Sequence, residues 1–365
     1  MNRKPVVLNL PALQQGKTIV ISDIHGNLKA LKHVLSLCHY DSSNDRLILA
    51  GDLLEKGEEN LATLRYIIQL CEQGNTYALM GNCDFTVKNA FLSYRLDFLK
   101  QILLTRKNSV LHEMANEIGI SFNKNTDMEV YCATLRKHFL KEMAFINDLP
   151  HVIETPDMII THAGIASEKQ YGDDFKITMT TPMFFETKQT FEKKVICGHM
   201  PVTEYQKYIA SFDPLYDPKK NIYSIDGGNI VKKGGQLNAL IFEDNHVDVK
   251  RYDDLPAAIC IQSVDYQNQI PLFVTWNRGE IEILKKERYQ SYIFCFHLKR
   301  AFWVDNEFIE QRHGKWYASD YTNYQIPLKE GDFVKIVREY QDKAQIKKDG
   351  VLGWTYLNNL RKLND

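Results

Sequence analysis

Apolar positions in the first 85 residues alternate between short runs that suit buried strands and longer stretches with helical spacing. Strand patterns cover 17–22, Arg46–Ala50 and Tyr77–Met80, and helical spacing covers 28–38 and Leu61–Cys71. Strands that alternate with helices in this way are typical of an α/β fold, in which helices cover a sheet of buried strands. We therefore predict a β-α-β-α-β series at the start of the chain.

The pattern changes after residue 85. Residues 85–147 hold periodic apolar positions with little Gly and no Pro, which predicts a helical insertion. The insertion either covers a functional site as a cap or forms a layer whose charged face is solvated. Strand patterns return at Met158–Thr161, Lys194–Cys197 and Ile222–Ile225, followed by a hairpin over 238–251 that turns at Glu243-Asp244-Asn245.

From residue 257 onward, short β-type runs replace helical periodicity. The runs are Pro271–Trp276, Ile281–Leu284, Tyr292–Leu298, Asp332–Arg338 and Ala344–Lys347. Gly or charged turns separate them, which is typical of a small all-β domain. We predict an α/β domain over 1–256 and a β-rich region over 257–365.

Charge and cysteine usage narrow the class of protein. The 365 residues carry 45 Lys and Arg against 46 Asp and Glu, so no bulk charge attracts nucleic acid or an anionic membrane. No apolar run approaches the ~20 residues of a membrane helix. The seven Cys include no C-x-x-C pair, so no disulfide framework or zinc knuckle is indicated. We expect a cytoplasmic protein with neither a nucleic-acid nor a membrane partner.

Five short polar motifs follow predicted strands in chain order. They are Asp23-Ile24-His25-Gly26-Asn27, Gly51-Asp52-Leu53-Leu54-Glu55, Gly81-Asn82-Cys83-Asp84, Thr161-His162-Ala163-Gly164 and Gly198-His199-Met200-Pro201. Because the carboxyl ends of strands share one edge of an α/β sheet, these motifs should meet there. Their oxygen and imidazole ligands suit two divalent ions such as Mn, Fe or Zn, and Asp52 is the candidate for a bridging carboxylate.

This ordered set resembles the calcineurin-like metallophosphoesterase superfamily over roughly residues 17–251. The motifs most similar to its phosphoprotein phosphatase branch are His162-Ala163-Gly164, Gly198-His199-Met200-Pro201 and the later Ile225-Asp226-Gly227-Gly228. That branch includes bacterial Ser/Thr phosphatases and symmetrical dinucleoside tetraphosphatases. The resemblance implies a β-sandwich flanked by helices, and a hydroxide between two metals that attacks phosphorus in line. It assigns the first metal to Asp23, His25 and Asp52, and the second to Asp52, Asn82, His162 and His199.

Three positions depart from that branch. Cys83 stands where the family carries a His that assists the leaving oxygen, and Glu55 and Lys56 replace an Asp that orients the His and an Arg that grips phosphate. Lys56, with Asn82, remains a candidate for substrate binding, although as a point charge without a bidentate fork. Cys83 is a catalytic candidate that either contacts metal as a thiolate, acts as a redox switch or simply fills the space of the lost His.

The tail carries a second resemblance. Residues 328–337 and 350–357 are similar to the Gly-Asp and Gly-Trp strands of a bacterial SH3-like barrel. The aromatic residues of this region either line a groove for a peptide partner or form the core of the barrel. They are Trp303, Trp316, Tyr317, Tyr321, Tyr324 and Trp354.

The function predicted from these patterns is a metal-dependent phosphoesterase that hydrolyses phosphomonoesters, with Ser/Thr phosphoproteins as candidate substrates. One alternative is a nucleotide pyrophosphohydrolase or phosphodiesterase. The other is a catalytically weakened metal-binding scaffold that acts through its SH3-like module. Since general acid catalysis contributes roughly 10²–10⁴-fold, the lost His should slow poor leaving groups most.

Overall fold

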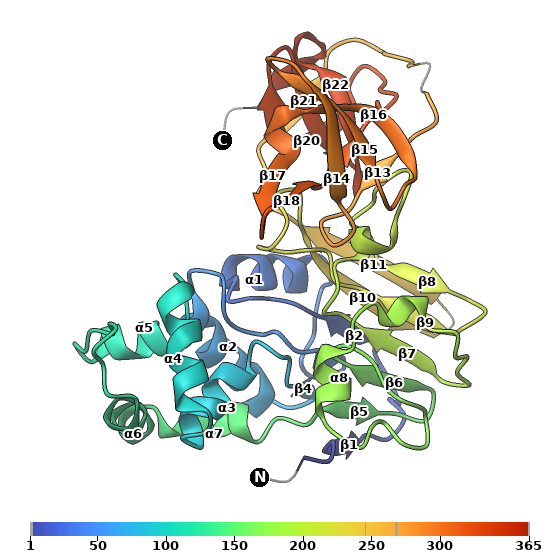
Figure 1. Cartoon of the computed structure of the whole chain (residues 1–365). Helices are drawn as coiled ribbons and strands as arrows, with labels where there is room; N and C mark the ends of the chain where they lie inside the picture. Colours follow the sequence, from blue (N-terminus) through green and yellow to red (C-terminus); the bar gives the residue numbers. More distant parts are fainter. Residues whose placement is uncertain (1–2, 245, 267–268, 364–365) are drawn as a thin grey trace. The chain divides into compact units, whose positions relative to one another are not determined.

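The computed structural model describes residues 3–244, 246–266 and 269–363 and divides into two compact units (Figure 1). The first holds the residues up to Pro201 together with Pro214–Asp253, and the second holds Val202–Asp213 and the residues from Asp254 onward. The predicted α/β fold followed by an all-β region is confirmed. Asn245, in the predicted hairpin turn, lies outside the described residues.

The first unit contains two sheets. In spatial order, one consists of β1 (Val7–Asn9), β5 (Val152–Glu154), β6 (Met158–Thr161), β7 (Lys194–Cys197), β9 (Ile222–Ser224) and β8 (Leu215–Asp217). The other consists of β11 (His246–Tyr252), β10 (Leu237–Glu243), β2 (Thr18–Ile21), β3 (Arg46–Leu49) and β4 (Thr76–Ala78). Strands β2, β3 and β4 run parallel, and so do β6, β7 and β9.

Alternate residues of these strands divide between two apolar layers, as expected for strands buried on both faces. Val20 and Ile48 of one sheet share a fully buried cluster with Ile160 and Ile196 of the other, so the two sheets form a sandwich. The neighbouring strand residues, such as Ile19, belong to a second cluster with the helices.

Helices cover the outer face of the β2-β3-β4 sheet. They are α1 (Leu28–Leu37), α2 (Asn60–Glu72), α3 (Phe85–Phe91), α4 (Leu96–Thr105), α5 (Val110–Glu117), α6 (Met128–His138) and α7 (Leu140–Asn147); α8 (Lys176–Thr180) and the 3-10 turn η1 (Phe184–Glu186) belong to the other half. The insertion is helical as predicted, and Leu99, Leu111 and Leu135 bury its inner face in the same cluster as Ile19. Among the described residues, no helix is long and apolar enough to cross a membrane.

A buried histidine near the edge of the sandwich gives the fold a pH dependence. Val6 N–H donates to His151 Nδ1 (3.1 Å), and the imidazole stacks on Phe175 with centroids 5.0 Å apart. Burial, with a smaller effect from Lys88, lowers the pKa of His151 from 6.5 to about 4. The unfolded state therefore binds the proton first, so this stabilising contribution is complete above pH 6.5 and is lost as the pH falls toward 4.

Between pH 7 and pH 5, the free energy of unfolding of the His151→Phe variant should fall by about 2 kcal/mol less than that of the wild type. Phe keeps the stack on Phe175 but binds no proton. Urea denaturation at both pH values measures the difference. The exposed His138, changed to Phe, is the control and should keep the wild-type slope; equal slopes for all three proteins would contradict the assignment.

The second unit is all β. In spatial order, one sheet consists of β22 (Val351–Tyr356), β21 (Lys343–Lys348), β20 (Phe333–Tyr340), β12 (Ala257–Cys260) and β23 (Leu360–Lys362). The other consists of β16 (Arg300–Asp305), β15 (Gln290–Cys295), β14 (Glu280–Lys286), β18 (Lys315–Ala318) and β17 (Ile309–Arg312). A two-stranded sheet pairs β13 (Phe273–Val274) with β19 (Tyr321–Thr322). Short 3-10 turns lie at Val202–Tyr205, Asn306–Phe308 and Leu357–Asn359.

The aromatic residues of this unit do not share one environment. Tyr321 and Trp354 are buried in one cluster, where Trp354 Nε1 donates to Thr322 O (2.8 Å). Trp303 and Trp316 keep 38% and 40% of their surface exposed. Part of the set is therefore core, whereas the SH3-like fold of the tail and its peptide partner stay predictions.

Candidate metal centre

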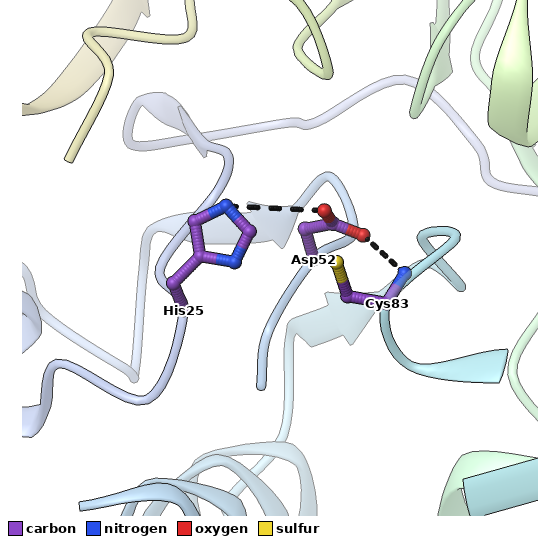
Figure 2. Close-up of side chains that lie close together, drawn as sticks. All are labelled: His25, Asp52 and Cys83. Atoms are coloured by element: carbon purple, nitrogen blue, oxygen red, sulfur yellow. Dashed lines mark hydrogen bonds and ion pairs between the residues drawn. The ribbon is translucent and has the colours of Figure 1, made fainter. Parts of the chain in front are cut away.

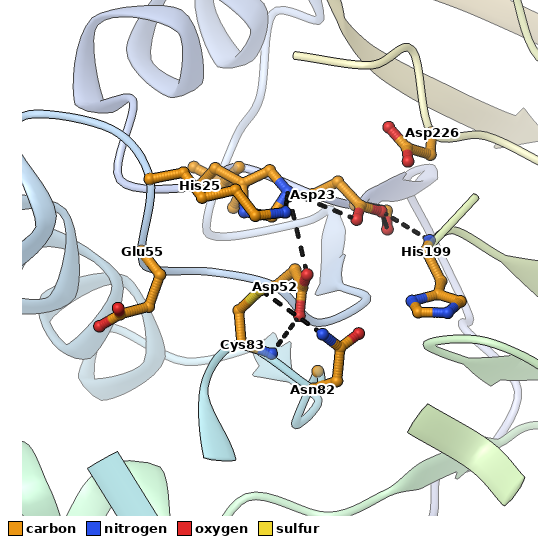
Figure 3. Close-up of polar contacts among 12 residues, drawn as sticks. Asp23, His25, Asp52, Glu55, Asn82, Cys83, His199 and Asp226 are labelled. Atoms are coloured by element: carbon orange, nitrogen blue, oxygen red, sulfur yellow. Dashed lines mark hydrogen bonds and ion pairs between the residues drawn. The ribbon is translucent and has the colours of Figure 1, made fainter. Parts of the chain in front are cut away.

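The six predicted ligands lie on loops that directly follow strands. β2 leads to Asp23 and His25, β3 to Asp52, β4 to Asn82, and β6 and β7 of the other sheet to His162 and His199. Backbone hydrogen bonds join these loops, among them Asp23 N to Gly51 O (3.0 Å) and Gly198 N to His162 O (2.8 Å). The structure therefore brings all six side chains together at one edge of the sandwich. Figure 3 shows five of them, Asp23, His25, Asp52, Asn82 and His199.

The backbone of these loops is unusual. Asp23, His25, Asp52 and His199 all have positive φ angles, between 49° and 70°. Non-Gly residues adopt this conformation rarely, and such strain is concentrated at functional sites, where the surrounding structure enforces it. The positive φ angles of these four residues therefore mark the loops as a candidate functional site.

Asp23, His25 and Asp52 form the first ligand group. His25 Nε2 lies 3.8 Å from Asp23 Oδ1 and 3.8 Å from Asp52 Oδ2, and all three side chains are buried. Burial and the charge of Asp52 raise the pKa of Asp23. Burial also acts to raise the pKa of Asp52, but the neighbouring His162 and His25 outweigh it and lower that pKa. Two buried carboxylates this close need cationic compensation to remain ionised together.

Asp52, Asn82, His162 and His199 form the second group. His162 Nδ1 lies 3.0 Å from the carbonyl oxygen of Ala50, and this hydrogen bond leaves the lone pair of Nε2 directed at Asp52 Oδ1, 3.4 Å away. Burial, followed by the effect of His162, lowers the pKa of His199 to about 4, so its imidazole is neutral near pH 7. Neutral imidazole is the form that ligates metals.

Asn82 lies against both imidazoles of the second group. One terminal atom of its amide is 2.8 Å from His199 Nδ1 and 3.2 Å from both His162 Nε2 and the carbonyl oxygen of Met179. With the amide nitrogen at this position, it donates to these three acceptors and the amide oxygen accepts from Cys83 N (3.2 Å). Since carboxylate, amide and imidazole together suit a borderline divalent ion, the donor set fits the expected metal.

Cys83 lies against the first group (Figure 2). Its backbone N–H donates to Asp52 Oδ1 (2.8 Å), and its thiol can approach a common point with His25 and Asp52. Burial and the charge of Asp52 raise the pKa of the thiol well above its usual range. Cys83 is 3% exposed, so its side chain is enclosed beside the ligands.

Lys56 reaches the same group from an exposed position. Its Nζ lies 3.3 Å from His25 Nε2, the atom expected to face the first metal. A divalent ion on His25 would repel this ammonium toward the open side of the centre. There it can attract an anionic phosphate as a point charge.

Glu55 binds the helical insertion, a role that the sequence patterns did not predict. Its fully buried carboxylate accepts hydrogen bonds from Arg106 Nη1 (2.6 Å), Ser109 Oγ (2.9 Å) and Val110 N (3.1 Å). It therefore joins the second motif to the start of α5 and holds a guanidinium from the insertion near the centre. No local pattern signals this contact, because Arg106 lies 51 residues further along the chain.

Two further buried carboxylates surround the ligands. Asp84 accepts hydrogen bonds from the backbone N–H groups of Gly81 (2.9 Å), Leu54 (3.1 Å) and Leu53 (3.3 Å), and so ties the second and third motifs together instead of capping α3. Asp226, after β9, accepts from Gly228 N (2.7 Å), and burial and the charge of Asp23 raise its pKa. In the sequence, the Ile225-Asp226-Gly227-Gly228 motif after the strand at Ile222–Ile225 indicates Asp226.

Gly198 allows His199 and Asp23 to come together. A Cβ at this position would lie 1.8 Å from Ser22 Oγ and 2.2 Å from Asp23 Oδ2. We expect the Gly198→Ala variant to displace Asp23 and to lose affinity for Mn²⁺ by at least about 10-fold although every ligand remains. Isothermal titration calorimetry measures this. Gly119→Ala controls for the strain of a Gly→Ala change elsewhere, because its φ is +74° but no atom lies within 4 Å of the added Cβ. Unchanged Mn²⁺ affinity in Gly198→Ala would contradict the geometry.

Comparison with known proteins bears on the same region. A profile of the calcineurin-like phosphoesterase family matches residues 16–249. The symmetrical bis(5'-nucleosyl)-tetraphosphatase of Vibrio vulnificus strain CMCP6 is 28% identical over 152 residues, which are 41% of this chain and 45% of that relative. An enzyme of the same name from Cellvibrio japonicus strain Ueda107 is 22% identical over 271 residues, covering 62% of this chain and 95% of its own. The chain thus spans less than half the length of the first relative.

Solved structures with a similar fold include a protein serine/threonine phosphatase from Saccharomyces cerevisiae, with a TM-score of 0.43 and 11% identity over 69% of this chain and 85% of its own. A metallophosphoesterase from Sphaerobacter thermophilus has a TM-score of 0.38 and 16% identity over 66% of this chain and 89% of its own. Neither likeness is close enough to add to the assignment. Because the family profile covers well over half of the 365 residues, the chain belongs to the calcineurin-like phosphoesterase family, as the resemblance of its motifs implied.

Proposed function

We propose that the chain hydrolyses nucleotide phosphoanhydrides, such as dinucleoside polyphosphates, at a two-metal centre, and that it acts poorly on phosphoserine and phosphothreonine. The observation that carries this proposal is that a buried Cys83, and not a His, lies beside Asp52. It favours the nucleotide pyrophosphohydrolase among the alternatives considered from the sequence. The names of the Vibrio and Cellvibrio relatives support the same substrate class.

The proposed ligands divide around Asp52, which faces both groups. Asp23, His25 and Asp52 would hold one cation, and Asp52, Asn82, His162 and His199 would hold the other. When bound, two such cations lower the pKa of a water molecule and neutralise charge on the phosphate. His162 contributes through the tautomer that Ala50 O selects, and Lys56 draws the anionic substrate toward the centre.

The leaving group then determines the rate. A thiol is a weak hydrogen-bond donor and therefore a poor substitute for an imidazolium as general acid. Glu55 cannot provide the missing acid, because its carboxylate is engaged by Arg106, Ser109 and Val110. A nucleotide phosphate or an aryl oxide leaves without a proton, whereas a serine alkoxide needs one.

A panel of substrates tests the proposal. Mn²⁺-loaded protein is assayed on diadenosine tetraphosphate, p-nitrophenyl phosphate, its bis-ester and a phosphoserine peptide. We expect kcat/KM to be highest for diadenosine tetraphosphate and lowest for the peptide, by roughly 10²-fold or more. Preference for the phosphoserine peptide would support the phosphoprotein phosphatase instead. Absence of metal-dependent turnover on all four would support the binding scaffold.

A further inference from the structure

A cavity of about 400 Å³ opens beside the metal centre, between the insertion and α8. Its walls come from the start of α3, from the turn that leads into α4, from α4 itself and from α8. This volume lies within the range of roughly 300–1,000 Å³ that is typical of small-molecule sites. All of these elements belong to the first unit.

The cavity and the proposed centre share residues. Asn82 lines the cavity, and its amide also lies against His162 and His199. Met179 lines the cavity as well, and its carbonyl oxygen lies 3.2 Å from the Asn82 amide. A group attached to a phosphate at the centre therefore has a direct path into the cavity.

Four aromatic rings line the cavity. Phe85 and Phe175 pack together at one side with centroids 5.4 Å apart. Tyr94 and Phe98 contribute two more rings, and 46% of the Phe98 surface is exposed. The guanidinium carbon of Arg95 lies 4.4 Å from the centroid of the Phe98 ring. A planar base can stack on such a surface, since rings and guanidinium planes both bind nucleobase faces.

The cavity is also positively charged. Arg3, Arg95 and Lys176 line it, and Arg3 is paired with Asp174. Within the described part of the chain, Arg95 and Lys176 form no ion pair, although the charge of Lys176 helps to lower the pKa of the nearby Asp174. Cations beside aromatic rings suit a ligand that combines a flat base with phosphate charge.

We propose that this cavity binds the nucleoside of the substrate, with its base on Phe98 and Arg95 and the phosphate nearest to it beside Lys176. The inference rests on the proposed function, because it assumes that a phosphate of the same molecule occupies the centre. It adds the feature that distinguishes nucleotides from other phosphates. An acidic phosphopeptide would use the cations but not the rings.

Calorimetry with two ligands that differ only in the base tests the stacking. Mn²⁺-loaded wild type and Phe98→Ala are titrated with AMP and with ribose 5-phosphate. We expect Phe98→Ala to weaken AMP roughly 10-fold and to leave ribose 5-phosphate unchanged. Leu104→Ala, an exposed apolar position on the same helix but outside this cavity, should bind both ligands as the wild type does.

The charge is tested separately with Lys176→Met. This variant should weaken AMP by roughly two- to fivefold relative to adenosine, because only the former carries the phosphate placed beside Lys176. The difference should shrink in high salt. Equal effects on both ligands would contradict the placement of the phosphate chain.

The outcomes separate the cavity from the proposed function. If the protein hydrolyses diadenosine tetraphosphate but Phe98→Ala binds AMP normally, the cavity assignment is wrong and the proposed function stands. If no phosphoanhydride is hydrolysed but AMP binding depends on Phe98, the cavity is supported and the proposed function is wrong. If Phe98→Ala weakens AMP and ribose 5-phosphate equally, the ring does not recognise a base and the inference is overturned.

Discussion

The Asp52→Asn variant is expected to lose at least about 10³-fold of metal-dependent kcat on diadenosine tetraphosphate. Asp52 Oδ2 faces His25 and Oδ1 faces His162, so its carboxylate is the one side chain that both ligand groups share. A bound metal contributes several kcal/mol of transition-state stabilisation, and about 4 kcal/mol corresponds to roughly 10³-fold in rate. Asn keeps the shape of the side chain but removes its charge and one oxygen ligand.

Asp157→Asn is the matched control for this variant. Asp157 is exposed and precedes β6, at the opposite end of the strand from His162. It should retain wild-type kcat. Activity in Asp52→Asn equal to that of Asp157→Asn would mean that Asp52 is not the bridging ligand.

The Cys83→His variant should hydrolyse alkyl phosphates roughly 10- to 100-fold faster than the wild type, with much less change on p-nitrophenyl phosphate and diadenosine tetraphosphate. A general acid contributes about 10²–10⁴-fold, and the lower end applies because no carboxylate is placed to orient the new imidazole. Glu55 is held by Arg106 and by the start of α5 instead. The measurement is kcat on glycerol phosphate against p-nitrophenyl phosphate.

Cys83→Ala separates a gained acid from a lost thiol. It should leave the rate on alkyl phosphates unchanged, because a thiol is a weak donor and contributes little there. Binding of Mn²⁺ to each variant shows that the centre still forms. A Cys83→His protein that binds metal but is no faster on glycerol phosphate would refute the argument from a missing acid.

Much of the fold could be predicted because its signals are local. Buried strands show apolar runs, and their order with helices indicates how the sheet is built. The strand at Met158–Thr161 matches β6, and Lys194–Cys197 matches β7. Polar motifs that follow such strands meet because the carboxyl ends of the strands share an edge, which accounts for the six residues brought together here.

Short strands and long-range pairs left no such signal. β1 and β23 have three residues each, too few for a periodic pattern. β12 at Ala257–Cys260 pairs with Leu360–Lys362, about a hundred residues away. The bond between Glu55 and Arg106 likewise depends on how the insertion folds over the second motif. Sequence spacing does not reveal a contact that forms only after two distant segments have packed together.

The central claim is that six strand-end residues hold two metal ions around Asp52, and counting bound metal tests it most directly. Wild type, Asp52→Asn and Asp157→Asn are dialysed to equilibrium against Mn²⁺, and the metal in each protein is measured by mass spectrometry. We predict two tightly held ions per chain in the wild type and in Asp157→Asn, and fewer in Asp52→Asn. Two ions in all three proteins, or none in the wild type, would contradict the claim that Asp52 joins two metal sites.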